Sequence, residues 1–374
     1  MIFIFYSLGL FVLAALPALM VYRSLPLFER ATTETEVPLP SVSVLIPARN
    51  EEVGIANCVQ AALVAAWPAC EVVVMDDHST DATVDILKQL QSQDARLRIA
   101  HAAELPVGWN GKQHACWQLA CTAQHEFLLF LDADVRLSPD ALKRWVSHFQ
   151  NGQVDLLSGF PHQECVGISE KLLIPMMYFL LLGYLPLDQM RANPKPEFGA
   201  GCGQLFLTRK SAYMQCDGHR AIQASRHDGL KLPRAFRAAG LMSDLFDASD
   251  TAKVRMYTTS REVVWGVLKN ADEGIANSKL IVLFTVLLLG ASVLPVLSLP
   301  HAAYYGWPLT AVLLLFFATV LSYMPRAMIA RRLKHSVWGV LLHPLAVAIF
   351  VALQWIAFVR RSLGFTTQWR GRVS

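Results

Sequence analysis

The chain of 374 residues is 54% hydrophobic and only 17% charged, with a mean hydropathy of +0.36. This composition excludes an ordinary soluble enzyme, in which about a quarter of the residues are charged, so part of the chain is expected to lie in lipid. The net charge of +4 is spread along the chain without a basic, aromatic-rich run, which excludes nucleic acid as a partner.

Residues 1–23 are predicted to form an N-terminal transmembrane anchor. The stretch from Ile2 to Tyr22 has no charged side chain and has about the 20-residue length needed to cross a bilayer. Arg23 and Arg30 follow directly, which places the N-terminus outside and the next segment in the cytoplasm. No basic region precedes the apolar stretch, so we expect it to stay uncleaved. A polar linker, Thr32 to Pro40, comes next.

Residues 40–276 are predicted to form a cytoplasmic α/β domain. Four short apolar runs alternate with helical stretches, at Val42–Pro47, Glu71–Met75, Arg96–Ala100 and Phe127–Leu131. Alternation of this kind predicts a parallel sheet with helices on both faces. In such sheets ligands bind beyond the carboxyl ends of the strands.

Acidic residues follow three of these runs. They are Glu51 and Glu52, then Asp76 and Asp77, then Asp132 and Asp134. A surface row of acids is the alternative, but their shared position at strand ends favours a binding site. Asp132 and Asp134 are suited to a hard divalent cation, which bridges diphosphate oxygens.

The motifs Pro47–Glu52, Asp76–Asp81, Gly108–Lys112 and Asp132–Asp134 together resemble glycosyltransferase family 2. The similarity is to its membrane-bound subgroup, which includes ceramide glucosyltransferase and bacterial carotenoid- and hopanoid-associated enzymes. The resemblance implies a GT-A (nucleotide-diphospho-sugar transferase, Rossmann-like) fold, a nucleotide-sugar donor of the UDP-hexose type, Mg²⁺ or Mn²⁺ as cofactor, and inversion. It also implies roles by position: a nucleoside site at Glu51 and Asp77, a diphosphate site at Lys112 and Asp132, and a metal site at Asp134 with Asp132.

The resemblance extends to the acceptor side. It implies that Asp228 is the catalytic base and that the glycine segment around Gly201 lies beside the acceptor. Polymer-forming members carry a QxxRW motif, whereas this chain has Arg261-Glu-Val-Val-Trp265. Trp265 is therefore retained as a substrate-binding candidate, while a polymer synthase is disfavoured. His227 replaces an acid of the family pattern, and its role, like that of Arg261, stays open.

About three further transmembrane segments are predicted in residues 279–358. A hairpin with a break between Leu299 and Pro308 is followed by a basic cytoplasmic loop, Arg326 to His335. The segment from Val337 to Phe358 either crosses or re-enters the membrane. A basic tail, 359–374, ends the chain. The apolar segment 172–187 is predicted to be interfacial, with a buried core helix as the alternative.

These observations predict an integral membrane protein of a bacterial inner membrane with a cytoplasmic catalytic domain. We expect it to move a single sugar to a lipid or other hydrophobic acceptor. A processive polysaccharide synthase is the alternative enzyme. A transporter or other non-enzymatic membrane protein is disfavoured, because only His343 is an ionisable candidate within the spans.

Overall fold

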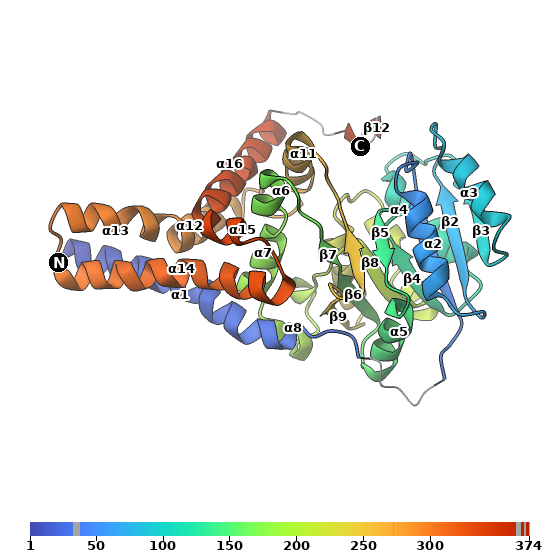
Figure 1. Ribbon diagram of the computed structural model, residues 1–374, viewed down its shortest axis with the longest axis horizontal. Helices are drawn as coiled ribbons and strands as arrows, with labels where there is room; N and C mark the ends of the chain where they lie inside the picture. Colours follow the sequence, from blue (N-terminus) through green and yellow to red (C-terminus); the bar gives the residue numbers. More distant parts are fainter. Residues whose placement is uncertain (33–37, 272, 364–367, 370–371, 374) are drawn as a thin grey trace. The chain divides into compact units, whose positions relative to one another are not determined.

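The structure is a computed structural model that describes residues 1–32, 38–271, 273–363, 368–369 and 372–373 (Figure 1). The chain divides into two compact units. The sheet unit comprises Phe28–Glu164, Gln189–Met256 and Gln368–Ser374; the helical unit comprises Met1–Leu27, Cys165–Asp188 and Tyr257–Thr367. Within the predicted domain 40–276, residues 165–188 and those from 257 onward thus group with the helices.

A seven-stranded sheet with the order β3-β2-β1-β4-β8-β6-β9 forms the centre of the sheet unit. Its first four strands are parallel, as expected, whereas β8 runs antiparallel to both β4 and β6. The strands, in spatial order, are β3 (Leu97–His101), β2 (Glu71–Asp76), β1 (Val42–Ala48), β4 (Phe127–Leu131), β8 (Leu205–Arg209), β6 (Leu156–Phe160) and β9 (Ser243–Asp247). The predicted α/β class is confirmed, with a mixed sheet.

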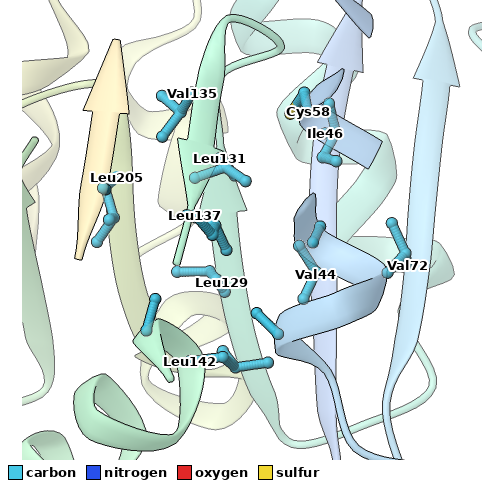
Figure 2. Close-up of a cluster of buried hydrophobic side chains, with 14 of the residues drawn as sticks. Val44, Ile46, Cys58, Val72, Leu129, Leu131, Val135, Leu137, Leu142 and Leu205 are labelled. Atoms are coloured by element: carbon cyan, nitrogen blue, oxygen red, sulfur yellow. The ribbon is translucent and has the colours of Figure 1, made fainter. Parts of the chain in front are cut away.

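Helices cover both faces of this sheet. On one face, α2 (Ile55–Ala65), α3 (Thr83–Gln91) and α5 (Ala141–Asn151) pack on alternate residues of the strands, such as Val44 and Leu129. Figure 2 shows this cluster, with Cys58 from α2 and Leu142 from α5 among the strand side chains. The opposite face packs on α4 (Gly111–Thr122), α9 (Lys210–Gln215) and α10 (Asp228–Ala238).

Short elements complete the sheet unit. A three-stranded sheet orders β5 (Val135–Leu137), β10 (Ala252–Val254) and β7 (His162–Gln163). The 3₁₀ helices are η1 (Pro196–Phe198) and η2 (Gly218–Ile222), and α8 (Leu187–Ala192) spans the unit boundary. β11 (Gln368–Trp369) pairs with β12 (Arg372–Val373).

The helical unit contains three helices long and apolar enough to cross a membrane, α1 (Ile2–Leu27), α14 (Leu309–Leu333) and α16 (His343–Ser362). The pair α12 (Ile281–Ser292) and α13 (Leu294–Tyr304), bent by 49°, makes a fourth if it counts as one span. In α1 the buried residues recur every three or four positions, while Phe5, Val12 and Leu19 are exposed. An exposed apolar face of this kind suits lipid.

The hairpin connection predicted between Leu299 and Pro308 falls within that range, since α13 ends at Tyr304 and α14 begins at Leu309. A further break at Val293, between α12 and α13, was not predicted; Pro295 follows it in the first turn of α13, where proline is tolerated. One membrane prediction needs correction. The predicted loop from Arg326 to His335 is mostly helical, since α14 continues to Leu333.

The apolar segment 172–187 forms the end of α6 (Ile168–Leu173) and all of α7 (Met176–Tyr184). α7 packs against α1 and α14, and Tyr178, Phe179 and Leu182 are fully buried. These side chains therefore face protein, as in the alternative of a core helix. The remaining helices of this unit are α11 (Ser260–Ala271) and α15 (Val337–Leu341).

Parts of two predicted segments lie outside the described residues. They are positions 33–37 of the linker and 364–367, 370–371 and 374 of the tail. Arg360 and Arg361, at the start of the predicted tail, lie on α16.

Candidate active site

The loops that follow β1 and β2 are joined by hydrogen bonds at the carboxyl edge of the sheet. Asn50 and His78 both have left-handed backbone conformations (φ 53° and 56°), so each strand ends in a sharp turn. The Thr80 N–H donates to Asn50 Oδ1 at 2.8 Å, and the Asn50 N–H donates to Ser79 Oγ at 3.0 Å. Ser79 and Thr80 thus bind the neighbouring loop, and α3 begins at Thr83.

Glu51 and Asp77, the nucleoside candidates, lie in these two loops. The Glu51 N–H donates to Thr83 Oγ1 at 2.8 Å, which fixes the backbone of the first loop. Asp77 is buried and its carboxylate lies 3.7 Å from the Arg49 guanidinium. The Asp77 N–H donates to the Ala48 carbonyl at 2.8 Å, which extends the β1–β2 pairing by one residue.

Asp132 and Asp134 follow β4 in a tight turn that the Val135 N–H closes on the Asp132 carbonyl at 3.1 Å. Burial first, and then the neighbouring charges of Asp132 and Glu51, raise the pKa of Asp134 to about 7. The three carboxylates are therefore close enough to repel one another. One oxygen of Asp134, Oδ1, is buried without a hydrogen-bond partner.

The acids fit a divalent cation of the kind that protein carboxylates hold jointly with substrate phosphates. Within the described part of the chain, no three His, Cys, Asp or Glu side chains are gathered as a complete metal site. Mg²⁺ and similar cations are commonly held by one or two carboxylates plus substrate phosphates. The unpartnered oxygen of Asp134 and the nearby Asp132 provide such carboxylates.

Lys112 lies at the start of α4, where Asn110 caps the helix by accepting the Lys112 N–H at 3.1 Å. Its Nζ lies 2.6 Å from Asp132 Oδ1 and 2.9 Å from Asp228 Oδ2, and it donates to the Gly203 carbonyl at 3.1 Å. Burial alone would lower the pKa of Lys112, but the two carboxylates raise it well above its usual value. The Lys112 ammonium is therefore charged, and it forms ion pairs with both the candidate metal ligand Asp132 and the candidate base Asp228.

Asp228 is the first residue of α10, and its side chain is only 10% exposed. Burial raises its pKa, yet the adjacent Lys112 charge outweighs this and holds the pKa below its usual value. Gly203 makes room for the carboxylate, because a Cβ at that position would lie 2.0 Å from Asp228 Oδ1. This glycine, which sequence reasoning did not single out, belongs to the same Gly199–Gly203 segment as Gly201.

Close packing against Ser158 fixes the position of Gly201. A Cβ there would lie 2.7 Å from Ser158 Oγ, and that hydroxyl accepts the Cys202 N–H at 2.7 Å. The glycine segment therefore lies tightly against β6. His227 immediately precedes α10, and its positive form would lower the pKa of Asp228 slightly.

A buried histidine that sequence reasoning missed also influences this cluster. The Tyr213 hydroxyl, which accepts the His219 N–H at 3.0 Å, lies 2.8 Å from His219 Nδ1. Burial lowers the pKa of His219 to about 3, so the ring is neutral although the Asp228 charge opposes this. No motif marks His219 in the sequence.

Trp265 belongs to the helical unit, on α11. The residue is 43% exposed, and the Arg360 guanidinium lies 5.3 Å from the centre of its ring. The remaining predicted site residues all lie in the sheet unit.

Comparison with known proteins identifies the domain. Residues 43–216 match the sequence profile of Glycosyl transferase family 2. This is a glycosyltransferase family 2 domain. The resemblance drawn from the motifs is confirmed for this domain.

Relatives of this chain occur in Staphylococcus aureus. Its 4,4'-diaponeurosporenoate glycosyltransferase is 27% identical over 248 residues, which is 64% of this chain. The matched region spans 63% of that relative's length. In another strain the match is 25% identical and covers 89% of this chain and 88% of the relative.

A solved structure supports the GT-A fold of this chain. A mannosyltransferase of Pyrobaculum calidifontis, in complex with GDP-mannose and Mn²⁺, superposes with a TM-score of 0.54 at 17% identity. The alignment covers 91% of this chain and 98% of the mannosyltransferase. At this identity the likeness concerns the fold alone.

Proposed function

We propose that this chain is a membrane-bound glycosyltransferase that moves a single sugar from a nucleotide-sugar donor to a lipid or other hydrophobic acceptor. The observation that carries the proposal is the Asp132–Lys112–Asp228 ion-pair chain within a family 2 domain. In this chain the Lys112 ammonium, proposed to bind the diphosphate, contacts both Asp132, a proposed metal ligand, and Asp228, the proposed base.

The donor is proposed to bind along the carboxyl edge of the sheet. Glu51 and Asp77 contact the nucleoside, and Lys112 contacts the diphosphate. Lys112 suits this role because the N-terminus of a helix such as α4 also favours an anion. Asp134 and Asp132 are proposed to hold Mg²⁺ or Mn²⁺, which when bound supplies positive charge for the leaving diphosphate.

Asp228 is proposed to be the general base of an inverting transfer. The attacking acceptor oxygen must lose its proton as the new bond forms, and a carboxylate near the sugar can accept it. Asp228 is the buried carboxylate next to Lys112, so a diphosphate bound to that lysine would bring the sugar near it. Gly201 is proposed to contribute to the acceptor side. Trp265 stays a substrate-binding candidate of the helical unit.

The acceptor is proposed to be hydrophobic for two reasons. The helical unit presents helices able to span a membrane, and the Staphylococcus aureus relative is named for 4,4'-diaponeurosporenoate, a carotenoid-related substrate. We place the family 2 domain in the cytoplasm at a bacterial inner membrane. The rival function, a processive polysaccharide synthase, is disfavoured by Arg261-Glu-Val-Val-Trp265 in place of QxxRW.

Lipid extraction followed by mass spectrometry tests the proposal. Cells with the gene should contain a lipid heavier by one sugar than the lipid of cells without it. Restoring the wild-type gene should bring the product back, and Asp228→Asn should fail to do so at equal protein level. The matched control, Asp94→Asn, alters a carboxylate that pairs with Arg96 at 2.7 Å, and it should restore the product. Identical lipid profiles in all strains would refute a lipid acceptor.

A further inference from the structure

We propose that Lys112 exchanges partners when the donor binds: its ammonium leaves Asp228 for the donor diphosphate, so that Asp228 becomes an unpaired base only once the donor is in place. This inference rests on the proposed function. It makes Lys112 a positioning residue that sets the order in which the substrates bind.

The first argument is that three oxygen atoms already surround the Lys112 ammonium. Asp132 Oδ1, Asp228 Oδ2 and the Gly203 carbonyl lie 2.6, 2.9 and 3.1 Å from Nζ. The contact with Asp228 is an ion pair without a hydrogen bond, because Asp228 Oδ2 has no hydrogen-bond partner. A diphosphate oxygen that approaches this ammonium therefore competes most directly with Asp228.

The second argument concerns which partner leaves. Asp132 stays close to positive charge in either state, because it is also a candidate ligand of the divalent cation. Gly203 has a neutral carbonyl, and its position is fixed by the tight packing of Gly201 on Ser158. Asp228 is the partner whose proposed role as base is hindered by an ion pair, since a neighbouring cation stabilises the unprotonated form.

The third argument is charge balance. One ammonium and the carboxylates of Asp132 and Asp228 leave one net negative charge in the ion-pair chain. A divalent cation and the two negative charges of a donor diphosphate add nothing to this sum. The exchange thus moves the Lys112 charge from one anion to another within the same site, without creating an uncompensated charge.

The structure also explains why Asp228 can remain in place when Lys112 leaves. Its Oδ1 accepts the Gly229 N–H at 2.8 Å, and Gly203 leaves no free volume beside it. These contacts do not involve Lys112. The carboxylate would therefore keep its position while its partner moves, as a base aimed at an acceptor must.

Competition for Lys112 predicts that removing an active-site carboxylate raises the affinity for a nucleoside diphosphate, and this affinity can be measured. Asp228 and the diphosphate both need the ammonium, so Asp228→Asn should tighten the binding of a nucleoside diphosphate even though it removes the base. We expect roughly five- to tenfold tighter binding, within the range of coupling between contacting residues. Lys112→Met should weaken binding by about tenfold or more, and Asp228→Asn should have almost no effect when combined with it.

The experiment is calorimetric titration of the full chain in detergent with UDP and with GDP, each with Mn²⁺. The variants are Asp228→Asn, Lys112→Met and the double variant, with Asp94→Asn as the matched control that should leave affinity unchanged. Thermal unfolding establishes that each variant is folded, and Asp228→Ser serves if Asp228→Asn is not. Unchanged or weaker binding by folded Asp228→Asn overturns the exchange.

A structure of the wild-type chain with the bound nucleotide and Mn²⁺ gives a second test that needs no variant. Lys112 Nζ should contact the diphosphate and lie more than about 4 Å from Asp228, beyond ion-pair distance. An intact Lys112–Asp228 pair beside a bound diphosphate overturns the inference but leaves the proposed function standing. If neither UDP nor GDP binds the wild type, the proposed function itself fails, and the exchange with it.

Discussion

At the residue scale, Asp134 lies in a site that disfavours its negative charge. Its pKa of about 7 in the folded chain, against 3.8 when unperturbed, reflects burial first and then the charges of Asp132 and Glu51. With such a raised pKa, the contribution of Asp134 to the free energy of unfolding is fully present below about pH 4 and is lost as the pH rises through about 7. The carboxylate is thus retained at a cost to stability, as functional groups often are.

Asp134→Asn should therefore make the metal-free protein more stable at pH 8, by about 1 kcal/mol or more, and no more stable at pH 4. The same variant should lose transfer activity and the stabilisation that excess Mn²⁺ gives the wild type. Thermal unfolding in detergent at the two pH values measures both effects. Asp94→Asn should show the opposite sign, because Arg96 lowers the pKa of Asp94. A destabilised Asp134→Asn protein at pH 8 would contradict the assignment.

A second residue-scale prediction concerns Gly203. Gly203→Ala places a Cβ 2.0 Å from Asp228 Oδ1, so the carboxylate must shift away from its present position. Because small displacements of a positioned base are costly, we expect turnover to fall about 100-fold. Gly152→Ala is the matched control, since its Cβ would make only ordinary contacts of 3.4 Å or more. Equal turnover of both variants would show that the position of Asp228 is unimportant.

The gathering of acidic residues at one edge of the sheet could be predicted from the sequence, whereas the residues that they contact could not. Asp132, Asp134 and Glu51 follow apolar runs, and parallel strands bring such positions to one edge. Lys112, Gly203 and Asp228 meet only through tertiary packing of α4, α10 and the glycine segment. No local pattern encodes that approach. His219 was missed for the same reason.

At the element scale, Arg326 explains why the end of α14 was misjudged from its charges. A basic residue after an apolar stretch normally marks the membrane boundary. Arg326 is instead fully buried: its guanidinium donates to the carbonyls of Gly339, Lys171 and Leu172, at 3.2, 3.0 and 3.2 Å. The charge is thereby solvated by three backbone carbonyls, and it joins α14 to α6 and α15. A hydropathy profile includes the charge of Arg326 but not the three carbonyls that accept its hydrogen bonds.

Replacing Arg326 with Gln should loosen the helical unit, because one amide cannot reach all three carbonyls. Hydrogen bonds to charged groups are worth about 1.5–3 kcal/mol each, and buried acceptors left unpaired are costly. We expect a loss of about 2 kcal/mol or more in thermal unfolding experiments in detergent. Arg331→Gln, at an exposed position one turn further along the same helix, should be nearly neutral. Equal stability of the two variants would show that the three bonds contribute little.

At the scale of the whole molecule, the chain combines a family 2 domain with a helical unit that could be recognised from hydropathy alone. Long uncharged stretches located α1, α12, α13, α14 and α16, because crossing a bilayer demands such length. The domain boundaries were less visible. Residues 165–188 and 257–276 were predicted within the bounds of the α/β domain, with 172–187 as an interfacial segment, but they group with the helices. Packing partners rather than local pattern decide to which unit a segment belongs.

The helical unit leads to the final prediction, which separates single transfer from polymer synthesis. Buried stripes and exposed apolar faces on α1 and α14 suit helices that lie in lipid, and an enzyme held there meets acceptors dissolved in the bilayer. We therefore expect the purified chain, given a labelled nucleotide sugar and a detergent-dispersed extract of membrane lipids, to yield a labelled lipid carrying one sugar. A water-soluble oligosaccharide should be glycosylated at least about 100-fold more slowly. Excess donor should not lengthen the product, because Val264 occupies the position of the arginine in QxxRW. Asp228→Asn is the inactive control and Asp94→Asn the active one. A ladder of products, or comparable rates on the soluble acceptor, would favour the polysaccharide synthase instead.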